Sequence, residues 1–360
     1  MALYLVTGGA GFIGSAIASA LLAAGERVRV LDDFSSGRRE NVESLPGRVE
    51  LFEGTISDPE MVDRAMRGVE IVFHQAAIPS VARSVEDPQA TMLAGVQGTT
   101  VVLDVARKRQ ARRVLFAASS SAYGDTPALP KVETMEVTPL SPYAVSKLAG
   151  EHLMRVFAHL YGMETLSLRY FNVFGPRQDP ASDYAAVIPK FITAAIAGRR
   201  PIVYGDGEQT RDFCHIDNAV QANLVAASTS RPLRGEVLNV ACGERTSLNQ
   251  LLAYISELSG RRLDPEHRDP RPGDVRDSLA DITAARRLLG FQPSVGVREG
   301  LKRTYEAFLK VAAGGATGAT GATGTAGATG AAGGTGGTGV AGAAGARARG
   351  PEKRHDTGAA

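Results

Sequence analysis

A tyrosine and a lysine stand four residues apart in this chain, at Tyr143 and Lys147. Four residues make about one turn of an α-helix, so the two side chains share one helix face. A nearby ammonium group stabilises a phenolate and lowers the tyrosine pKa from about 10. The pair therefore predicts a general base that works near neutral pH.

Three consecutive serines, Ser119, Ser120 and Ser121, follow an apolar run over residues 113–118. The run predicts a buried strand, and residues 142–160 predict the helix that carries the tyrosine and the lysine. A hydroxyl group at the end of this strand can polarise a substrate oxygen and share its proton with the tyrosine. The serines therefore predict a second part of the same site.

Glycines at positions 8, 11 and 14 have the spacing of a dinucleotide-binding turn. An apolar strand over residues 2–6 precedes them, and an apolar helix over residues 15–24 follows. Glycine permits a tight turn and close backbone approach, and the N-terminus of the helix offers free N–H groups to a pyrophosphate. This context predicts a dinucleotide site.

Asp32 ends the next predicted strand, over residues 27–32, and indicates which dinucleotide binds. A carboxylate at this place accepts hydrogen bonds from the adenosine ribose and repels a 2′-phosphate, which favours NAD over NADP. Arg38 and Arg39 in the following loop could favour NADP, but arginines in such a polar loop are more often simply solvated. We therefore expect NAD.

Strand-like and helix-like runs alternate along the chain. Further strands are expected over residues 49–52, 70–74 and 165–170, and further helices over 59–66 and 88–109. Such alternation predicts an α/β fold with a doubly wound parallel sheet, a Rossmann fold. Ligands of these sheets bind at the carboxyl ends of the strands.

Composition limits the protein's compartment and partners. A net charge of +2 with 22% charged residues gives no reason to expect nucleic acid or an anionic membrane as a partner. Two cysteines, Cys214 and Cys242, cannot form a disulfide framework, so we expect a cytoplasmic location and no bound metal. Residues 2–25 carry no charge, but they lack the basic start of a signal peptide, and the strand–turn–helix pattern explains them better than a membrane span.

The end of the chain has a composition of its own. Glycine occupies every third position from Gly315 to Gly345, with alanine and threonine in most other places. That period is typical of collagen, but a triple helix also needs abundant proline, and this segment has none before Pro351. We expect a disordered, low-complexity tail, with a collagen-like trimer as the less favoured alternative.

Taken together, the motifs resemble the extended short-chain dehydrogenase/reductase family, specifically its nucleotide-sugar 4-epimerases. The resemblance runs from residue 2 to about residue 310. Besides the glycine turn, the serines and the Tyr–Lys pair, it rests on His74-Gln75-Ala76-Ala77, Tyr123-Gly124 and the run from Arg169 to Arg177. It implies an NAD-binding Rossmann domain over residues 1–170, a smaller C-terminal α/β domain for a UDP-sugar over 171–312, and the disordered tail over 313–360.

Positions that match the family's motifs give the expected site residues. The expected catalytic residues are Ser119, Tyr143 and Lys147, with Ser120 and Ser121 as helpers. NAD is expected to contact Gly8, Gly11, Phe12, Ile13, Gly14, Asp32, Ser36, Gly37, Thr55, Ile56, Gln75, Ala76, Ala77, Tyr143, Lys147 and Tyr170. The UDP-sugar is expected to contact Ser119, Ser121, Tyr143, Asn172, Val187, Tyr204, Arg211, Arg271, Asp274 and Ser278.

The resemblance also implies a reaction. Dehydrating members of the family carry an Asp–Glu pair after the catalytic serine or threonine, where this chain has Ser120 and Ser121. Epimerisation at C4 through a transient 4-keto sugar needs only a base, tightly bound NAD and room for the sugar to turn. Ser278 stands where epimerases restricted to plain hexoses have a tyrosine, which leaves space for a 2-acetamido group.

We therefore expect interconversion of UDP-N-acetylglucosamine and UDP-N-acetylgalactosamine. The alternatives are a UDP-glucose or UDP-glucuronate 4-epimerase and, in another class, a catalytically silent NAD-binding scaffold. The family resemblance implies a homodimer that forms through the helices over residues 88–109 and 142–160.

Two positions depart from the family. Thr55 replaces the Asp that often meets the adenine amine, and Gly95 replaces an Asn that usually helps order the active site.

Overall fold

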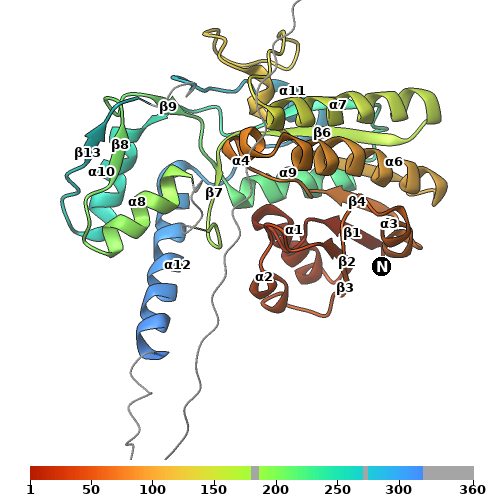
Figure 1. Cartoon of the computed structure of the whole chain (residues 1–360), viewed down its shortest axis with the longest axis horizontal. Coiled ribbons are helices and arrows are strands. Elements are labelled where there is room, and N and C mark those ends of the chain that lie inside the picture. Colours follow the sequence, from red (N-terminus) through yellow and green to blue (C-terminus); the bar gives the residue numbers. More distant parts are fainter. Residues whose placement is uncertain (180–185, 271–274, 319–360) are drawn as a thin grey trace, which may run out of the picture. The chain divides into compact units, whose positions relative to one another are not determined.

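A seven-stranded sheet forms the centre of the protein in the computed structural model, which describes residues 1–179, 186–270 and 275–318 (Figure 1). The strand order is β11-β6-β5-β4-β1-β2-β3, and all neighbours are parallel. The strands are β1 (Leu3–Thr7), β2 (Arg27–Asp32), β3 (Glu50–Glu53), β4 (Ile71–His74), β5 (Arg113–Ser119), β6 (Glu164–Tyr170) and β11 (Glu236–Val240). The chain moves outward in opposite directions from β1 and β4, which confirms the predicted doubly wound sheet. Sheets of this kind bind ligands at the carboxyl ends of their strands, where the strand order reverses.

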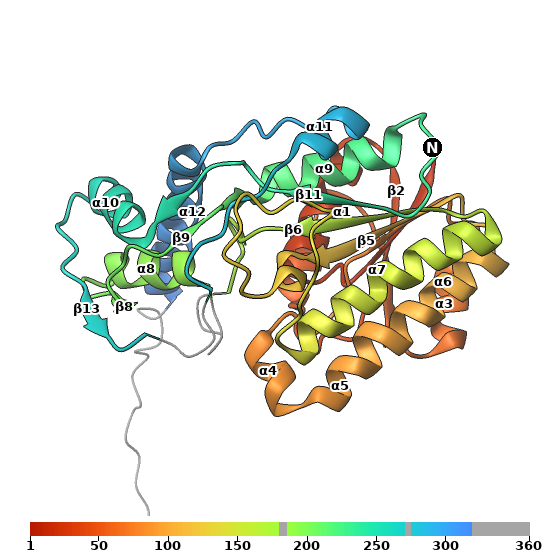
Figure 2. The ribbon, with the colours of Figure 1, turned by 90° about the horizontal axis from the view of Figure 1, so that it is seen from above.

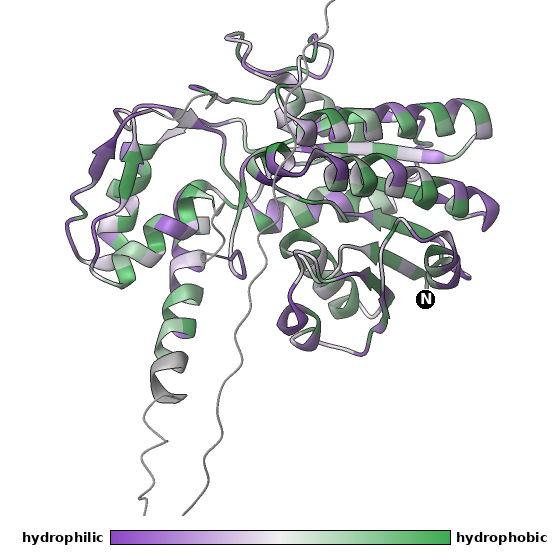
Figure 3. Ribbon diagram, in the orientation of Figure 1, coloured by the Kyte–Doolittle hydropathy of each residue, from purple (hydrophilic) through white to green (hydrophobic). Residues whose placement is uncertain are grey.

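Helices cover both faces of this sheet (Figure 2). One face carries α1 (Phe12–Ala23), α9 (Ile216–Ser228) and α11 (Thr283–Leu289), and the other carries α3 (Pro59–Met66), α6 (Thr99–Lys108) and α7 (Pro142–Tyr161). The central strands are apolar along most of their length, whereas the surrounding helices alternate apolar and polar residues (Figure 3). This is the pattern of a sheet that is buried on both sides.

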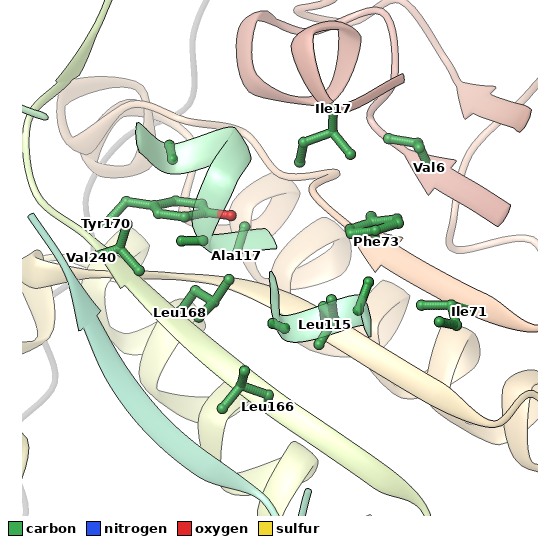
Figure 4. Packing of buried hydrophobic residues seen from close by; sticks show 14 of the residues in the cluster. Val6, Ile17, Ile71, Phe73, Leu115, Ala117, Leu166, Leu168, Tyr170 and Val240 are labelled. Carbon is green, nitrogen blue, oxygen red and sulfur yellow. The ribbon is translucent and has the colours of Figure 1, made fainter. Parts of the chain in front are cut away.

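The packing beneath α1 shows how the sheet is held. Val6, Phe73, Leu115 and Leu168, from four neighbouring strands, lie in one layer below Ile17 of α1 (Figure 4). All five side chains are almost completely buried. Each such side chain contributes roughly 1.5–3 kcal/mol when it leaves water, so this layer holds the strand ends, and the loops after them, in fixed positions.

The helix that carries Tyr143 and Lys147 has clear boundaries. Ser141 caps the N-terminus of α7 by accepting a hydrogen bond from the backbone N–H of Ala144, and a proline occupies the first helical turn. Gly162 ends the helix in the left-handed conformation, with φ of 66°. These signals fix where the helix begins, and therefore where the tyrosine lies.

The helix predicted over residues 88–109 is divided into three pieces. They are α5 (Pro88–Met92), the π-helical segment η1 (Leu93–Gly98) and α6. A π-helical turn takes one residue more than an α-helical turn, so residues before and after it face different sides. Such segments occur often at functional sites.

A smaller lobe lies beside the carboxyl ends of the strands and has its own apolar core. Its strands pair as β7 (Val173–Phe174) with β10 (Cys214–His215), β8 (Ile202–Tyr204) with β13 (Glu266–Arg268), and β9 (Thr210–Arg211) with β12 (Thr246–Ser247). Its helices are α8 (Val187–Ile196), α10 (Leu248–Ser259) and α12 (Val297–Gly318). Short helices α2 (Arg39–Glu43), α4 (Val81–Glu86) and the 3₁₀ turn η2 (Ser120–Tyr123) complete the described elements.

The chain does not leave the large sheet for good after β6. It enters the small lobe, returns through α9 and β11 to the large sheet, and then enters the small lobe again. Residues Met1–Gly315 form one compact unit by their contacts. The predicted domain boundaries near residues 170 and 312 remain predictions, and residues 319–360 of the predicted tail lie outside the described residues. None of the helices in the described ranges has the length and apolar content needed to cross a membrane.

Candidate active site

The first βα turn is a cradle that only glycine can form. Gly8 has a φ of +69°, and a Cβ atom on it would lie 2.7 Å from the backbone nitrogen of Ala76. A Cβ on Gly14 would lie 2.1 Å from the carbonyl oxygen of Gly8. Gly11 is the N-cap residue of α1 and brings no side chain over the helix end, so the first N–H groups face outward. This cradle fits the pyrophosphate of NAD.

Asp32 lies directly beside the cradle and is 8% exposed. Its Oδ2 accepts a hydrogen bond from the Ala10 N–H (2.8 Å), and its Oδ1 accepts one from the Phe34 N–H (2.8 Å). Burial raises the pKa of Asp32, and the two N–H groups oppose that shift. Gly37 packs against the same carboxylate, since a Cβ there would lie 2.8 Å from Oδ1. Each carboxylate oxygen keeps a lone pair for a ribose hydroxyl, so this residue fits the adenosine half of NAD.

The remaining predicted cofactor residues lie around the same sheet edge. Ile56 is buried, whereas Thr55 is exposed and accepts a hydrogen bond from the Ser57 N–H (3.2 Å). The others are at the start of α1 (Phe12, Ile13), in the loop after β2 (Ser36) and in the loop after β4 (Ala76, Ala77).

Gln75 and Tyr170 are joined by a residue that the sequence analysis missed. Tyr170 Oη donates to Gln75 Oε1 (3.3 Å), and Asn223 Nδ2 donates to Tyr170 Oη (2.7 Å). Asn223 lies on α9 and is fully buried. The sequence around Asn223 does not indicate this role, because no local pattern shows that α9 returns to the large sheet.

The structure brings the three predicted catalytic residues together. Ser119 lies close enough to Tyr143 for its hydroxyl to lower the pKa of the phenol. Ser119 Oγ already accepts hydrogen bonds from the Ser121 N–H (3.2 Å) and the Ser121 hydroxyl (2.9 Å), so its own proton is free to be donated to the tyrosine oxygen. Lys147 Nζ lies 5.9 Å from the centre of the Tyr143 ring and donates to the Ala117 carbonyl (2.8 Å).

Burial controls the charges of this group. It raises the pKa of Tyr143, while the hydrogen bond from Ser119 lowers it. Burial also lowers the pKa of Lys147 to about 8. The Tyr–Lys spacing predicts a lowered tyrosine pKa, but in the protein by itself the pKa of Tyr143 is raised, because burial outweighs the effect of Ser119. A cationic ring bound beside the phenol would favour the phenolate.

Three of the predicted substrate residues, Asn172, Arg211 and Ser278, lie around residues 210–212. Asn172 follows β6 with a φ of 36° and donates through Nδ2 to the Asp212 carbonyl (3.0 Å). Arg211 Nη1 donates to the Thr210 carbonyl (3.0 Å), and the Ser278 N–H donates to the same carbonyl (3.1 Å). Arg211 and Ser278 are thus neighbours.

The other predicted substrate residues are more widely spread. Val187 begins α8 and packs against the core of the small lobe, and Tyr204 ends β8 and is partly buried. Arg271 and Asp274 lie outside the described residues.

The parallel sheet, the glycine cradle, the buried acid after β2 and the Ser–Tyr–Lys group define a dinucleotide-dependent enzyme that acts on a hydroxyl-bearing substrate. Residues 4–241 match the NAD dependent epimerase/dehydratase family. The chain belongs to this family, which confirms the predicted resemblance and the NAD cofactor.

Similar proteins carry several UDP-sugar names. The chain is 41% identical over 311 residues to a UDP-glucose 4-epimerase of Mycolicibacterium smegmatis, covering 84% of this chain and 97% of that one. A solved UDP-glucose 4-epimerase of Thermotoga maritima with UDP-glucose has a TM-score of 0.81 and 38% identity, covering 86% and 99%. A UDP-N-acetylglucosamine 4-epimerase of Methanobrevibacter ruminantium, in complex with UDP-N-acetylmuramic acid, has a TM-score of 0.82 and 36% identity, covering 86% and 99%.

Proposed function

We propose that the protein interconverts UDP-N-acetylglucosamine and UDP-N-acetylgalactosamine by epimerisation at C4. The reaction type is supported by the Ser119–Tyr143–Lys147 group and by two serines, not acids, at positions 120 and 121. Similar proteins named as UDP-sugar 4-epimerases support it independently. The substrate is supported chiefly by the small side chain at Ser278.

Tyr143 is the proposed base for the proton of the 4-hydroxyl group. Ser119, which lowers the pKa of the tyrosine, would share that proton and hold the substrate oxygen. Lys147 contributes positive charge close to the phenol and is fixed by the Ala117 carbonyl. NAD, when bound, supplies a reversible acceptor for the C4 hydrogen, so no further reductant is needed.

The backbone around Ser278 is held firmly, which gives its side chain a defined place. The Ser278 N–H donates to the Thr210 carbonyl (3.1 Å), and the Thr210 hydroxyl donates to Asp277 Oδ1 (2.5 Å). A tyrosine at this position would extend an aromatic ring into space that a serine leaves open. We therefore expect room for a 2-acetamido group beside Ser278.

The competing substrates follow from the comparisons and from the family. UDP-glucose is favoured by the relatives that carry that name. UDP-glucuronate is the further alternative.

The test is the ratio of kcat/KM for the acetylated and plain UDP-hexose pairs, with UDP-glucuronate assayed alongside. We expect the wild-type enzyme to prefer the acetylated pair, and Ser278→Tyr to reverse that preference by at least about tenfold, because one extra or missing small group in a substrate pocket is worth roughly 1–3 kcal/mol. Ser278→Ala is the matched control and should keep the wild-type ratio. Turnover restricted to the plain pair or to UDP-glucuronate in the wild-type enzyme would remove the acetylated substrate from the proposal.

We also propose a homodimer, as the family resemblance implies. Helix α7 contacts both α4 and η1. These three elements carry exposed apolar side chains: Val81, Val85, Leu93, Val145, Val156 and Leu160. An exposed apolar surface of this kind is typical of a protein interface. Sedimentation at micromolar concentration should give twice the mass of one chain, and Val85→Glu should reduce it to the mass of one chain.

A further inference from the structure

His74 is a buried titratable side chain for which the proposed reaction has no use. It ends β4, lies opposite Thr7 of β1 in the register of the sheet, and is completely buried. Its Nδ1 lies 2.7 Å from Thr7 Oγ1, and its Nε2 lies 3.0 Å from Thr99 Oγ1. The Thr99 hydroxyl in turn donates to the Gly95 carbonyl (2.6 Å). Thr7, His74, Thr99 and the Gly95 carbonyl form a continuous buried chain of hydrogen bonds.

The direction of each hydrogen bond in this network follows from the groups at its two ends. Because the Thr99 hydroxyl donates to a carbonyl, its oxygen must accept from His74, which places the histidine proton on Nε2. Nδ1 is then an acceptor for the Thr7 hydroxyl, while the Thr7 oxygen accepts from the Ala76 N–H (3.3 Å). Burial lowers the pKa of His74 to about 3, so the neutral ring persists at working pH. Breaking any link leaves a buried polar group without a partner, which is costly.

One end of this hydrogen-bond network lies under the glycine turn that is proposed to hold NAD. Thr7 is the residue before Gly8, and Gly8 is so close to the loop after β4 that a Cβ on it would lie 2.7 Å from Ala76. The hydrogen bonds from Ala76 to Thr7 and from Thr7 to His74 therefore fix the glycine turn against this loop.

The other end of the hydrogen-bond network lies against α7, the helix that carries Tyr143 and Lys147. Gly95 is in η1, and a Cβ on it would lie 2.7 Å from Cβ of Ser146 on α7. Ser146 directly precedes Lys147, and its hydroxyl donates to the Tyr143 carbonyl (2.8 Å). The position of Gly95 therefore sets how closely this turn of α7 approaches the sheet.

We propose that His74 is a positioning residue that ties the glycine turn to α7 through Thr7, Thr99 and Gly95. It fixes the separation between the bound NAD and the Tyr143–Lys147 pair. The inference rests on the proposed roles of those two residues. Glycine at position 95 allows this close approach, because any side chain there would collide with Ser146.

The hydrogen bond from His74 to Thr7 and the hydrogen bond from His74 to Thr99 can be removed separately. Asparagine at position 74 is long enough to reach Thr7 in place of Nδ1 but too short for Thr99, whereas glutamine reaches toward Thr99 in place of Nε2. His74→Asn and Thr99→Val should keep NAD through desalting at the wild-type stoichiometry but lower kcat about tenfold or more, with KM within about twofold, because small misplacements of reacting groups are expensive. His74→Gln and Thr7→Val should lose NAD on desalting, and added NAD should restore kcat to within about threefold of wild type.

Two controls accompany these variants. Thr99→Ser keeps the hydroxyl and should restore kcat. Thr100→Val removes the neighbouring hydroxyl, which is exposed and bonds only locally to the Val96 carbonyl, and should change neither quantity.

The proposal is supported if the Thr99-side variants lose kcat and keep NAD while the Thr7-side variants lose NAD. Parallel loss of both in every variant, or no loss in any variant, would overturn it. If the wild-type enzyme turns over no UDP-hexose, the proposed function fails, and the amount of NAD that each variant retains decides about His74. Low NAD in Thr7→Val with normal NAD in Thr99→Val supports the positioning role of His74. Equal NAD content in the two variants contradicts it.

Discussion

At the scale of single residues, burial sets the charges that the site depends on. It lowers the pKa of Lys147 to about 8 and of His74 to about 3, and it raises the pKa of Tyr143. A neutral histidine can serve as a fixed hydrogen-bond donor and acceptor. A neutral phenol becomes a base only when a nearby positive charge lowers its pKa.

His74 should make the protein sensitive to acid. The folded protein keeps the ring neutral down to about pH 3, whereas the unfolded chain takes up a proton near pH 6.5. The unfolded state therefore binds more protons between these values, and the free energy of unfolding falls by about 1.4 kcal/mol per pH unit below about 6. Urea unfolding of wild type and His74→Gln between pH 7 and pH 5 measures this, since the variant lacks the titrating ring. Equal slopes in the two proteins would show that His74 is not neutral in the fold.

The grouping of Ser119, Tyr143 and Lys147 was predictable because the signals for it are local. The four-residue spacing of Tyr143 and Lys147, and the serines at the end of an apolar strand, can be recognised in the sequence alone. Asn223 and Thr99 could not be recognised, because each acquires its meaning from a partner far away in the sequence, Tyr170 in one case and His74 in the other.

At the scale of elements, a buried ion pair joins β6 to α7. The Arg169 guanidinium donates to both oxygens of Glu151 (2.8 and 2.7 Å), and its centre lies 4.6 Å from the ring centre of Tyr123. Burial opposes the charge on Arg169, but Glu151 more than compensates and raises its pKa. Glu151 is one helical turn after Lys147, so this pair anchors the same face of the helix.

Removing one partner of this pair should be far worse than removing both. Glu151→Ala leaves a buried guanidinium without its counter-ion and should lower the free energy of unfolding by about 3–5 kcal/mol. The double variant Glu151→Leu, Arg169→Leu should lose clearly less, because well-packed apolar groups can replace a buried pair. Urea unfolding of the three proteins measures both effects. A cost below about 1 kcal/mol for Glu151→Ala would contradict the anchoring role.

Several element boundaries were predictable to within one residue from the apolar runs and the residues that flank them. The strands expected over residues 27–32 and 165–170 appear as Arg27–Asp32 and Glu164–Tyr170, and the helix expected over 59–66 appears as Pro59–Met66. No local pattern in residues 88–109 indicated the π-helical segment, in which Gly95 packs closely against Ser146 of α7.

At the scale of the whole molecule, the Rossmann sheet followed from the alternation of strands and helices. Its seventh strand, β11, did not. Residues 236–240 are a short run with only three apolar residues, and nothing in the sequence indicates which sheet it joins. The return of α9 and β11 matters for the site, because it supplies Asn223 beneath Tyr170 and leads the chain to the backbone N–H groups that hold the Asp212 carboxylate.

The whole account depends on one chemical event: the hydrogen at C4 of the sugar leaves and returns without exchange with water, while Tyr143 handles the hydroxyl proton. The direct measurement uses UDP-N-acetylglucosamine deuterated at C4, the protein as purified, and no added NAD. The account predicts UDP-N-acetylgalactosamine that keeps its deuterium at C4, and a loss of turnover of about a thousandfold or more in Tyr143→Phe. Product that has lost the label to solvent, or a Tyr143→Phe enzyme as active as wild type, would contradict it.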